Sequence, residues 1–175
     1  MTADLFVGVV AGVVASVVWL FGTRRVRPRV EIAPVIAQLP DEARHGRSAA
    51  YQIKVINRAR RGAVDLCFEL VLLRPARTKG GTVQVRRTIP LLGSTPLVLP
   101  GTRGKGDQDH NAYRLSTAVD LRQLLDEFPD ACLRLRVMAR DEVTGTGRLA
   151  ERSYHEPRSD LQVGRYARGQ AFEIV

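Results

Sequence analysis

The sequence predicts a mainly β domain, a two-layered sandwich with one short helix, preceded by a single N-terminal membrane-spanning helix. An apolar run without charge extends from Leu5 to Gly22. Most later segments alternate apolar and polar residues, and turn residues separate them at short intervals. We therefore expect three parts: residues 1–22 as the tail and the membrane helix, residues 23–29 as a basic linker, and residues 30–175 as the β-sandwich.

The apolar run is predicted to be an uncleaved membrane anchor. As a helix, Leu5–Gly22 would extend roughly 27 Å, close to the thickness of the hydrocarbon layer. Trp19 falls near its end, where an indole favours the water–lipid interface. A cleavable signal would carry its basic residues before the apolar run. Here they follow it, which predicts an external N-terminus and a cytoplasmic domain at the cell membrane; these residues are Arg24, Arg25, Arg27 and Arg29.

Small residues recur at a spacing of four along the predicted helix. Gly8, Gly12 and Ser16 fall on one face, which would allow a second helix to approach closely. This pattern predicts self-association as a homo-oligomer, or packing against a helix of another protein. The alternative is that small residues are simply common in membrane helices.

Positive charge is concentrated in the first half of the predicted domain. The net charge is +9; residues 23–87 hold 15 Lys and Arg against 5 Asp and Glu, whereas residues 88–175 hold 12 of each. Anionic lipid attracts basic residues beside a membrane, so membrane lipid is an expected partner. Nucleic acid is not expected, because the chain lacks a recognition-helix pattern, zinc-finger spacing and an aromatic stacking motif.

The elements expected after residue 29 are mostly strands. Pro34 should confine the first of them to a sheet edge. Asp120 can cap the one predicted helix, Leu121–Phe128. The predicted strands are Val30–Ala37, Ala49–Asn57, Ala63–Pro75, Thr82–Leu91, Ala112–Val119, Ala131–Arg140, Arg148–Tyr154 and Gln170–Val175.

Two stretches resemble the cytoplasmic domain of inward-rectifier potassium channels. The segment "YQIKVINRARRGAVDLCFELVLLRP" is similar to the opening hairpin of that family. The chain end is similar through Thr144-Gly145, Ser153-Tyr154, Asp160-Leu161 and Gly164-Arg165-Tyr166. The resemblance implies an immunoglobulin-like sandwich of the E-set kind. It does not imply channel activity, because the chain has no pore helix and no Thr-x-Gly-Tyr-Gly filter.

The chain shows no motif for catalysis, for a metal or for a cofactor. His45, His110 and His155 are isolated, and no Gly-x-Ser-x-Gly turn or phosphate-binding loop is present. Cys67 and Cys132 are expected to be buried free thiols. The predicted function is a non-catalytic, membrane-anchored interaction module, with strand edges or loops that bind another protein. The alternatives are a small subunit of a larger membrane complex, or a sensor of anionic lipid or ligand.

Overall fold

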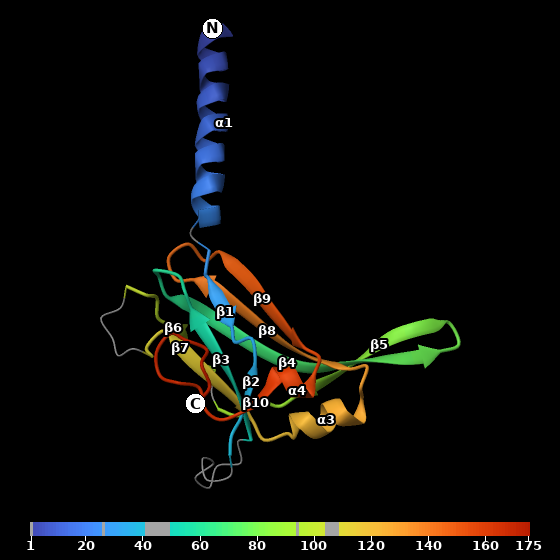
Figure 1. Cartoon of the computed structure of the whole chain (residues 1–175). Helices are drawn as coiled ribbons and strands as arrows, with labels where there is room; N and C mark the ends of the chain where they lie inside the picture. The colour runs from blue at the N-terminus through green and yellow to red at the C-terminus, as the bar shows by residue number, and fades with distance from the viewer. Residues whose placement is uncertain (1, 26, 41–49, 94, 104–108) are drawn as a thin grey trace.

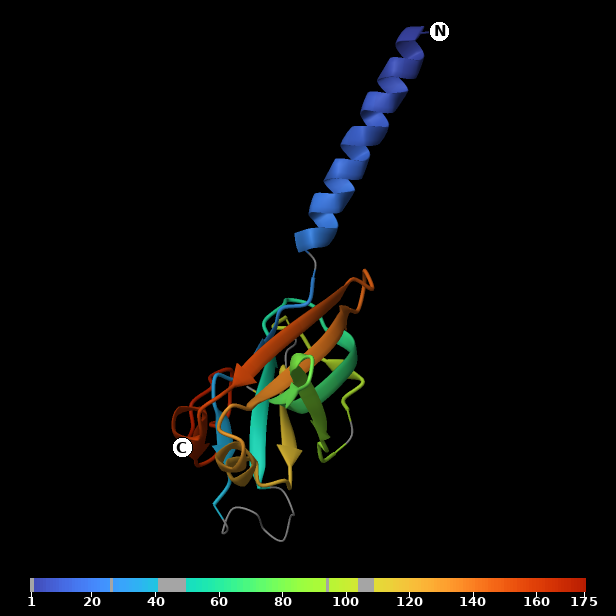
Figure 2. The same cartoon turned by 90° about the vertical axis from the view of Figure 1, so that its right-hand side faces the viewer.

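The chain folds into a helix followed by a two-sheet β-sandwich (Figures 1 and 2). The computed structural model describes residues 2–25, 27–40, 50–93, 95–103 and 109–175. Helix α1 (Thr2–Arg25) leads into the domain at the end where β1 begins. The mainly β sandwich predicted from the sequence is confirmed.

The first sheet is centred on β3 (Tyr51–Asn57). This strand pairs antiparallel with β1 (Val30–Ile32), β2 (Ile36–Gln38) and β7 (Ala112–Thr117), and β10 (Leu161–Val163) adds parallel to β2. The predicted strand over residues 30–37 is thus two short strands, separated around Pro34, which cannot donate a hydrogen bond to a sheet.

The second sheet is centred on the long strand β4 (Ala63–Thr78). It pairs antiparallel with β5 (Gly81–Ile89), β6 (Val98–Leu99) and β8 (Cys132–Asp141), and β9 (Gly147–Tyr154) follows β8 at the edge. The pairing of β4 with β8 shifts between Val64 and Cys67, and Asp65 has a positive φ of 50°. This is a β-bulge, which bends β4 where it leaves β6.

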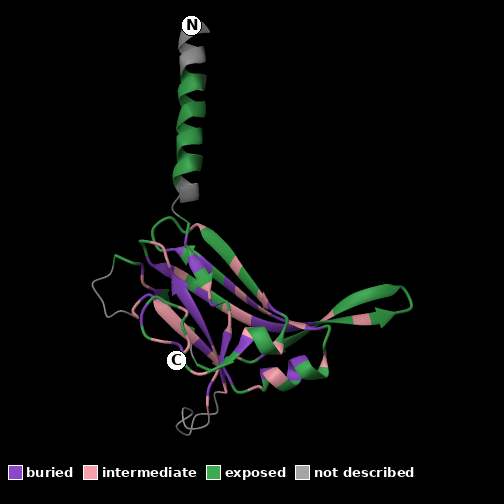
Figure 3. Ribbon diagram, in the orientation of Figure 1, coloured by how far each residue is buried: buried purple, intermediate pink, exposed green. Residues whose placement is uncertain are grey.

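The core lies between the sheets, and its residues follow the predicted alternation (Figure 3). On β8, Leu133, Leu135 and Val137 are fully buried, while the intervening arginines face outward. Helix α3 (Leu121–Glu127) closes one end of the sandwich with Leu121, Leu124 and Leu125. Its predicted cap is confirmed, because Asp120 Oδ1 accepts a hydrogen bond from the Gln123 amide at 3.0 Å.

The chain end differs from the prediction. A short helix, α4 (Pro157–Asp160), precedes β10, and neither was expected. The predicted strand over residues 170–175 is wrong: within this range only Ile174 makes a β-bridge, an isolated one with Tyr166. Tyr166, Phe172 and Ile174 pack against Ala33 and Ala37, so the chain end covers one side of the first sheet.

The expected membrane-spanning helix requires a correction. Among the described residues, no helix combines the length and the apolar character needed to cross a bilayer. For the part of the chain that the structure describes, the prediction of a transmembrane helix is therefore wrong.

Candidate functional site

The edge of β4 carries a gap in the second sheet. On this side β6 pairs with Ala63 and Val64, and β5 pairs from Leu70 onward. Residues 65–69 therefore have no strand partner here among the described residues. At about 3.4 Å per residue the open edge is roughly 17 Å long. An unpaired edge presents free backbone N–H and C=O groups to any extended chain that can reach them.

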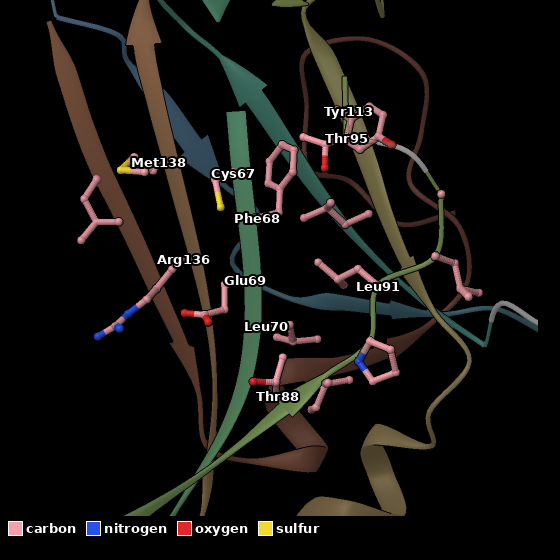
Figure 4. A pocket seen from close by; sticks show the side chains of 16 residues that line it. Cys67, Phe68, Glu69, Leu70, Thr88, Leu91, Thr95, Tyr113, Arg136 and Met138 are labelled. Atoms are coloured by element: carbon pink, nitrogen blue, oxygen red, sulfur yellow. The ribbon is translucent and has the colours of Figure 1, made fainter. Parts of the chain in front are cut away.

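A groove with a volume of about 530 Å³ follows this edge (Figure 4). Because successive side chains of a strand point to opposite faces, the groove has walls on both sides of β4. Its inner wall contains Phe68, Tyr113 and Leu91, and its outer wall contains Cys67 and Met138. Both walls are thus mainly apolar, which suits apolar side chains at alternate positions of an added strand.

Aromatic packing shapes the inner wall. The rings of Phe68 and Tyr113 stack with centroids 5.7 Å apart and an angle of 17° between their planes. Phe68 comes from β4 and Tyr113 from β7, so the pair bridges the two sheets beside the gap. Stacked rings form a firm apolar surface, which favours a groove that exists before a partner arrives.

Ion pairs border the outer wall. Glu69 pairs with Arg86 of β5, and Arg136 Nε lies 2.6 Å from Glu151 Oε1 across β8 and β9. The charges within each ion pair offset one another, so the outer wall of the groove carries little net charge. Affinity at this site would therefore come from backbone hydrogen bonds and apolar contact.

Two other sheet edges are less suited to strand addition. The outer edge of β9 presents Arg148 and Arg152, and charged side chains protect an edge from pairing. Strand β10 is only three residues long. The gap in β4 combines an open edge with apolar walls, and it is a stronger docking candidate than either of these two edges.

The structure describes the side chains of two of the four arginines that were predicted to face a membrane. Arg27 and Arg29 line a second cavity together with arginines from turns far along the chain. The side chains of Arg24 and Arg25 lie outside the described residues. Trp19 is 74% exposed on α1.

The small-residue face is also present on α1. Gly12 and Ser16 border a shallow groove, and Ser16 Oγ donates a hydrogen bond to the Gly12 carbonyl at 2.8 Å. Gly8 lies one turn earlier, and outside the helix backbone no described atom lies within 4 Å of the place where a Cβ would stand. Self-association through this face stays a prediction.

The cysteines differ from the expectation. Cys67 is exposed on the outer wall of the groove, and Cys132 is partly buried, so the prediction of two buried thiols is wrong. Both are free, and no group of three or more His, Cys, Asp or Glu side chains that could hold a metal occurs among the described residues.

Comparison with protein-family models gives no match, and neither does comparison with curated proteins.

Proposed function

We propose that this protein is a non-catalytic interaction module that binds an extended segment of another protein by strand addition to β4. The main support for this proposal is the gap at residues 65–69, where an unpaired strand edge lies between apolar walls on both faces of β4. Backbone pairing would supply affinity, and the side chains that enter the two walls would supply specificity. The preferred partner is an uncharged segment rich in β-branched or aromatic residues.

For the fold we propose an immunoglobulin-like assignment of the E-set kind, similar to the cytoplasmic domain of inward-rectifier potassium channels but without a pore. Its support is the packing of two largely antiparallel sheets around one core. For location we propose the cytoplasmic face of the cell membrane. Its support is the basic segment after α1, since the cytoplasmic leaflet is the anionic one.

The test is peptide selection on the full-length protein. A library of displayed linear peptides is selected on wild type, and the affinity of the selected peptides is then measured for M138R/L149R. Met138 and Leu149 line the outer wall and are 49% and 55% exposed, so arginine is tolerated there without a cavity in the core. We expect these peptides to bind the variant about tenfold more weakly or worse.

The matched control is V163R/V175R. These two valines are also exposed, lie outside the groove, and give the same change of charge. Peptides that bind both variants as tightly as wild type would contradict the proposal. Equal weakening by both variants would contradict it as well, because the effect would then come from charge alone.

Cys67 offers a second readout within the same experiment. Because its thiol is exposed on the groove wall, a bound strand should slow its alkylation, while alkylation of Cys132 serves as the internal reference. Selected peptides that leave the Cys67 rate unchanged would contradict binding at β4.

A further inference from the structure

Six arginines gather at the pole of the domain where α1 joins it. They surround a cavity of about 600 Å³, and Asp141 is the only acidic residue among the described residues that line it. The arginines come from the segment after α1, from the turn between β3 and β4, and from the loop after β6. They are Arg27, Arg29, Arg58, Arg60, Arg61 and Arg103.

The backbones that carry these arginines are fixed to one another. Asn57 is fully buried, and its amide group donates to the carbonyls of Arg61 at 2.9 Å and Leu99 at 3.0 Å. The Arg58 amide donates to the Arg29 carbonyl at 2.7 Å. These bonds join the three segments before any ligand arrives, so the arginines need little ordering on binding.

Close packing also holds these segments in place. The Thr102 amide donates to the Ala59 carbonyl at 2.8 Å. Gly101 lies so near the turn that a Cβ there would stand 2.5 Å from the Arg60 carbonyl carbon. The loop after β6 therefore holds Arg103 beside Arg60.

Most of the positive charge at this pole is not neutralised by the residues that the structure describes. Arg58 Nε pairs with Glu31 at 2.8 Å, and Arg61 Nη1 lies 3.8 Å from Asp141. Asp141 is only 2% exposed and also accepts hydrogen bonds from the Val143 and Thr144 amides. The remaining four arginines make no ion pair with the described residues, and all four are exposed; they are Arg27, Arg29, Arg60 and Arg103.

We propose that this arginine pole binds the phosphate of an anionic phospholipid head group. Guanidinium groups match phosphate oxygens in shape and charge, and four of them here are exposed and make no ion pair with the described residues. Helix α1 leaves the same pole with exposed apolar side chains such as Val18, Trp19 and Phe21, which are typical of contact with lipid. Nucleic acid fits less well, because none of the described residues that line the cavity is aromatic and could stack on a base.

The experiment measures binding of the full-length protein to vesicles of phosphatidylcholine, with and without phosphatidylglycerol. Binding to the neutral vesicles gives the contribution of the apolar helix. The test variant is R60Q/R103Q, which removes two arginines that make no ion pair with the described residues. At roughly fivefold for each arginine, the preference for anionic vesicles should fall about 25-fold, and raised salt should weaken the wild-type preference.

The control variant is R77Q/K79Q, which removes two charges from the tip of the β4–β5 hairpin, far from the pole (Figure 1). Its preference should match that of wild type, and all three proteins should share one thermal unfolding midpoint. An unchanged preference in R60Q/R103Q, or an equal fall in both variants, would overturn the proposal. Saturable binding of inorganic pyrophosphate without any preference for anionic vesicles would also overturn it, by assigning the pole to a soluble phosphate.

Discussion

Lys54 is a fully buried charge that holds the chain end against the first sheet. Its ammonium group donates three hydrogen bonds, at 2.9, 2.6 and 3.0 Å, to the carbonyls of Ala167, Gly169 and Ala171. Asp109 lies 3.5 Å away. Burial, together with the charge of Arg114, holds the pKa of Lys54 below its usual range despite Asp109. All three N–H groups of the ammonium are used in these hydrogen bonds, so Lys54 is bound specifically to the backbone of the segment that covers the sheet.

Replacing Lys54 with methionine should therefore release residues 165–175. Three carbonyls would lose their donor and Asp109 would lose a cation, so we expect the free energy of unfolding to fall by about 3 kcal/mol. Chemical denaturation measures this loss, and hydrogen exchange should show faster exchange in the chain end. The control K79M, at an exposed site, should change stability by less than about 0.5 kcal/mol. A K54M protein as stable as this control would contradict the assigned role.

Asp141 should make stability depend on pH in the acid range. Burial raises the pKa of Asp141, but hydrogen bonds from Thr144 and Val143 and the charge of Arg61 outweigh burial and hold the pKa below its usual value. A lowered folded-state pKa stabilises the protein above the unfolded pKa of about 3.9, and this stability is lost as the pH falls through the folded value.

The variant D141N should therefore be less stable than wild type at pH 7, by about 1 to 2 kcal/mol. The difference should shrink as the pH is lowered below about 4, because wild type then loses its carboxylate too. Urea denaturation of both proteins across this range provides the measurement. A difference that stays constant with pH would show that the charge of Asp141 is not the source of its stabilising effect.

Among the elements, the β4–β5 hairpin extends beyond the sandwich (Figure 1). Strand β8 pairs with β4 only as far as Leu73, so the outer hairpin has two strands alone. None of residues 75–84 is buried. We expect a two-residue Asn-Gly turn in place of residues 76–83 to change the free energy of unfolding by less than about 1 kcal/mol. A loss of several kcal/mol in a denaturant titration would show that the arm packs on the domain.

The strands could be predicted where alternation is governed by one buried face. This holds for β8 and for the second half of β7, where buried and partly exposed residues alternate. The Asp120 cap was also predictable, because it depends only on residues next to the helix start. Strand β10 was not predicted, because it pairs in parallel with β2, which lies more than a hundred residues earlier in the chain. Its three residues carry no periodic signal long enough to detect.

The candidate groove could not be found from the sequence for a related reason. The gap at residues 65–69 depends on where β5 and β6 stop pairing, and register is a property of several strands together. The basic segment "NRARRG" joins the predicted strands that end at Asn57 and begin at Ala63, so a turn between them was expected. The position of this turn close to Arg27 and Arg103 is seen only in the folded structure.

At the scale of the whole molecule, the groove at β4 and the arginine pole share no lining residue. Sites without common side chains usually act independently. We therefore expect M138R/L149R to keep the preference for anionic vesicles, and R60Q/R103Q to keep peptide affinity within about twofold. Titrating each variant with the other ligand measures this. Loss of both activities in either variant would show that the two surfaces form one site.

The most direct test of the central claim is amide hydrogen exchange of the full-length protein with and without a selected peptide. If a strand adds to β4, exchange should slow in residues 65–69, whose edge gains hydrogen bonds, while β9 and β10 remain unchanged. Protection at β9, at β10 or at the hairpin instead, with residues 65–69 unaffected, would contradict strand addition at this edge.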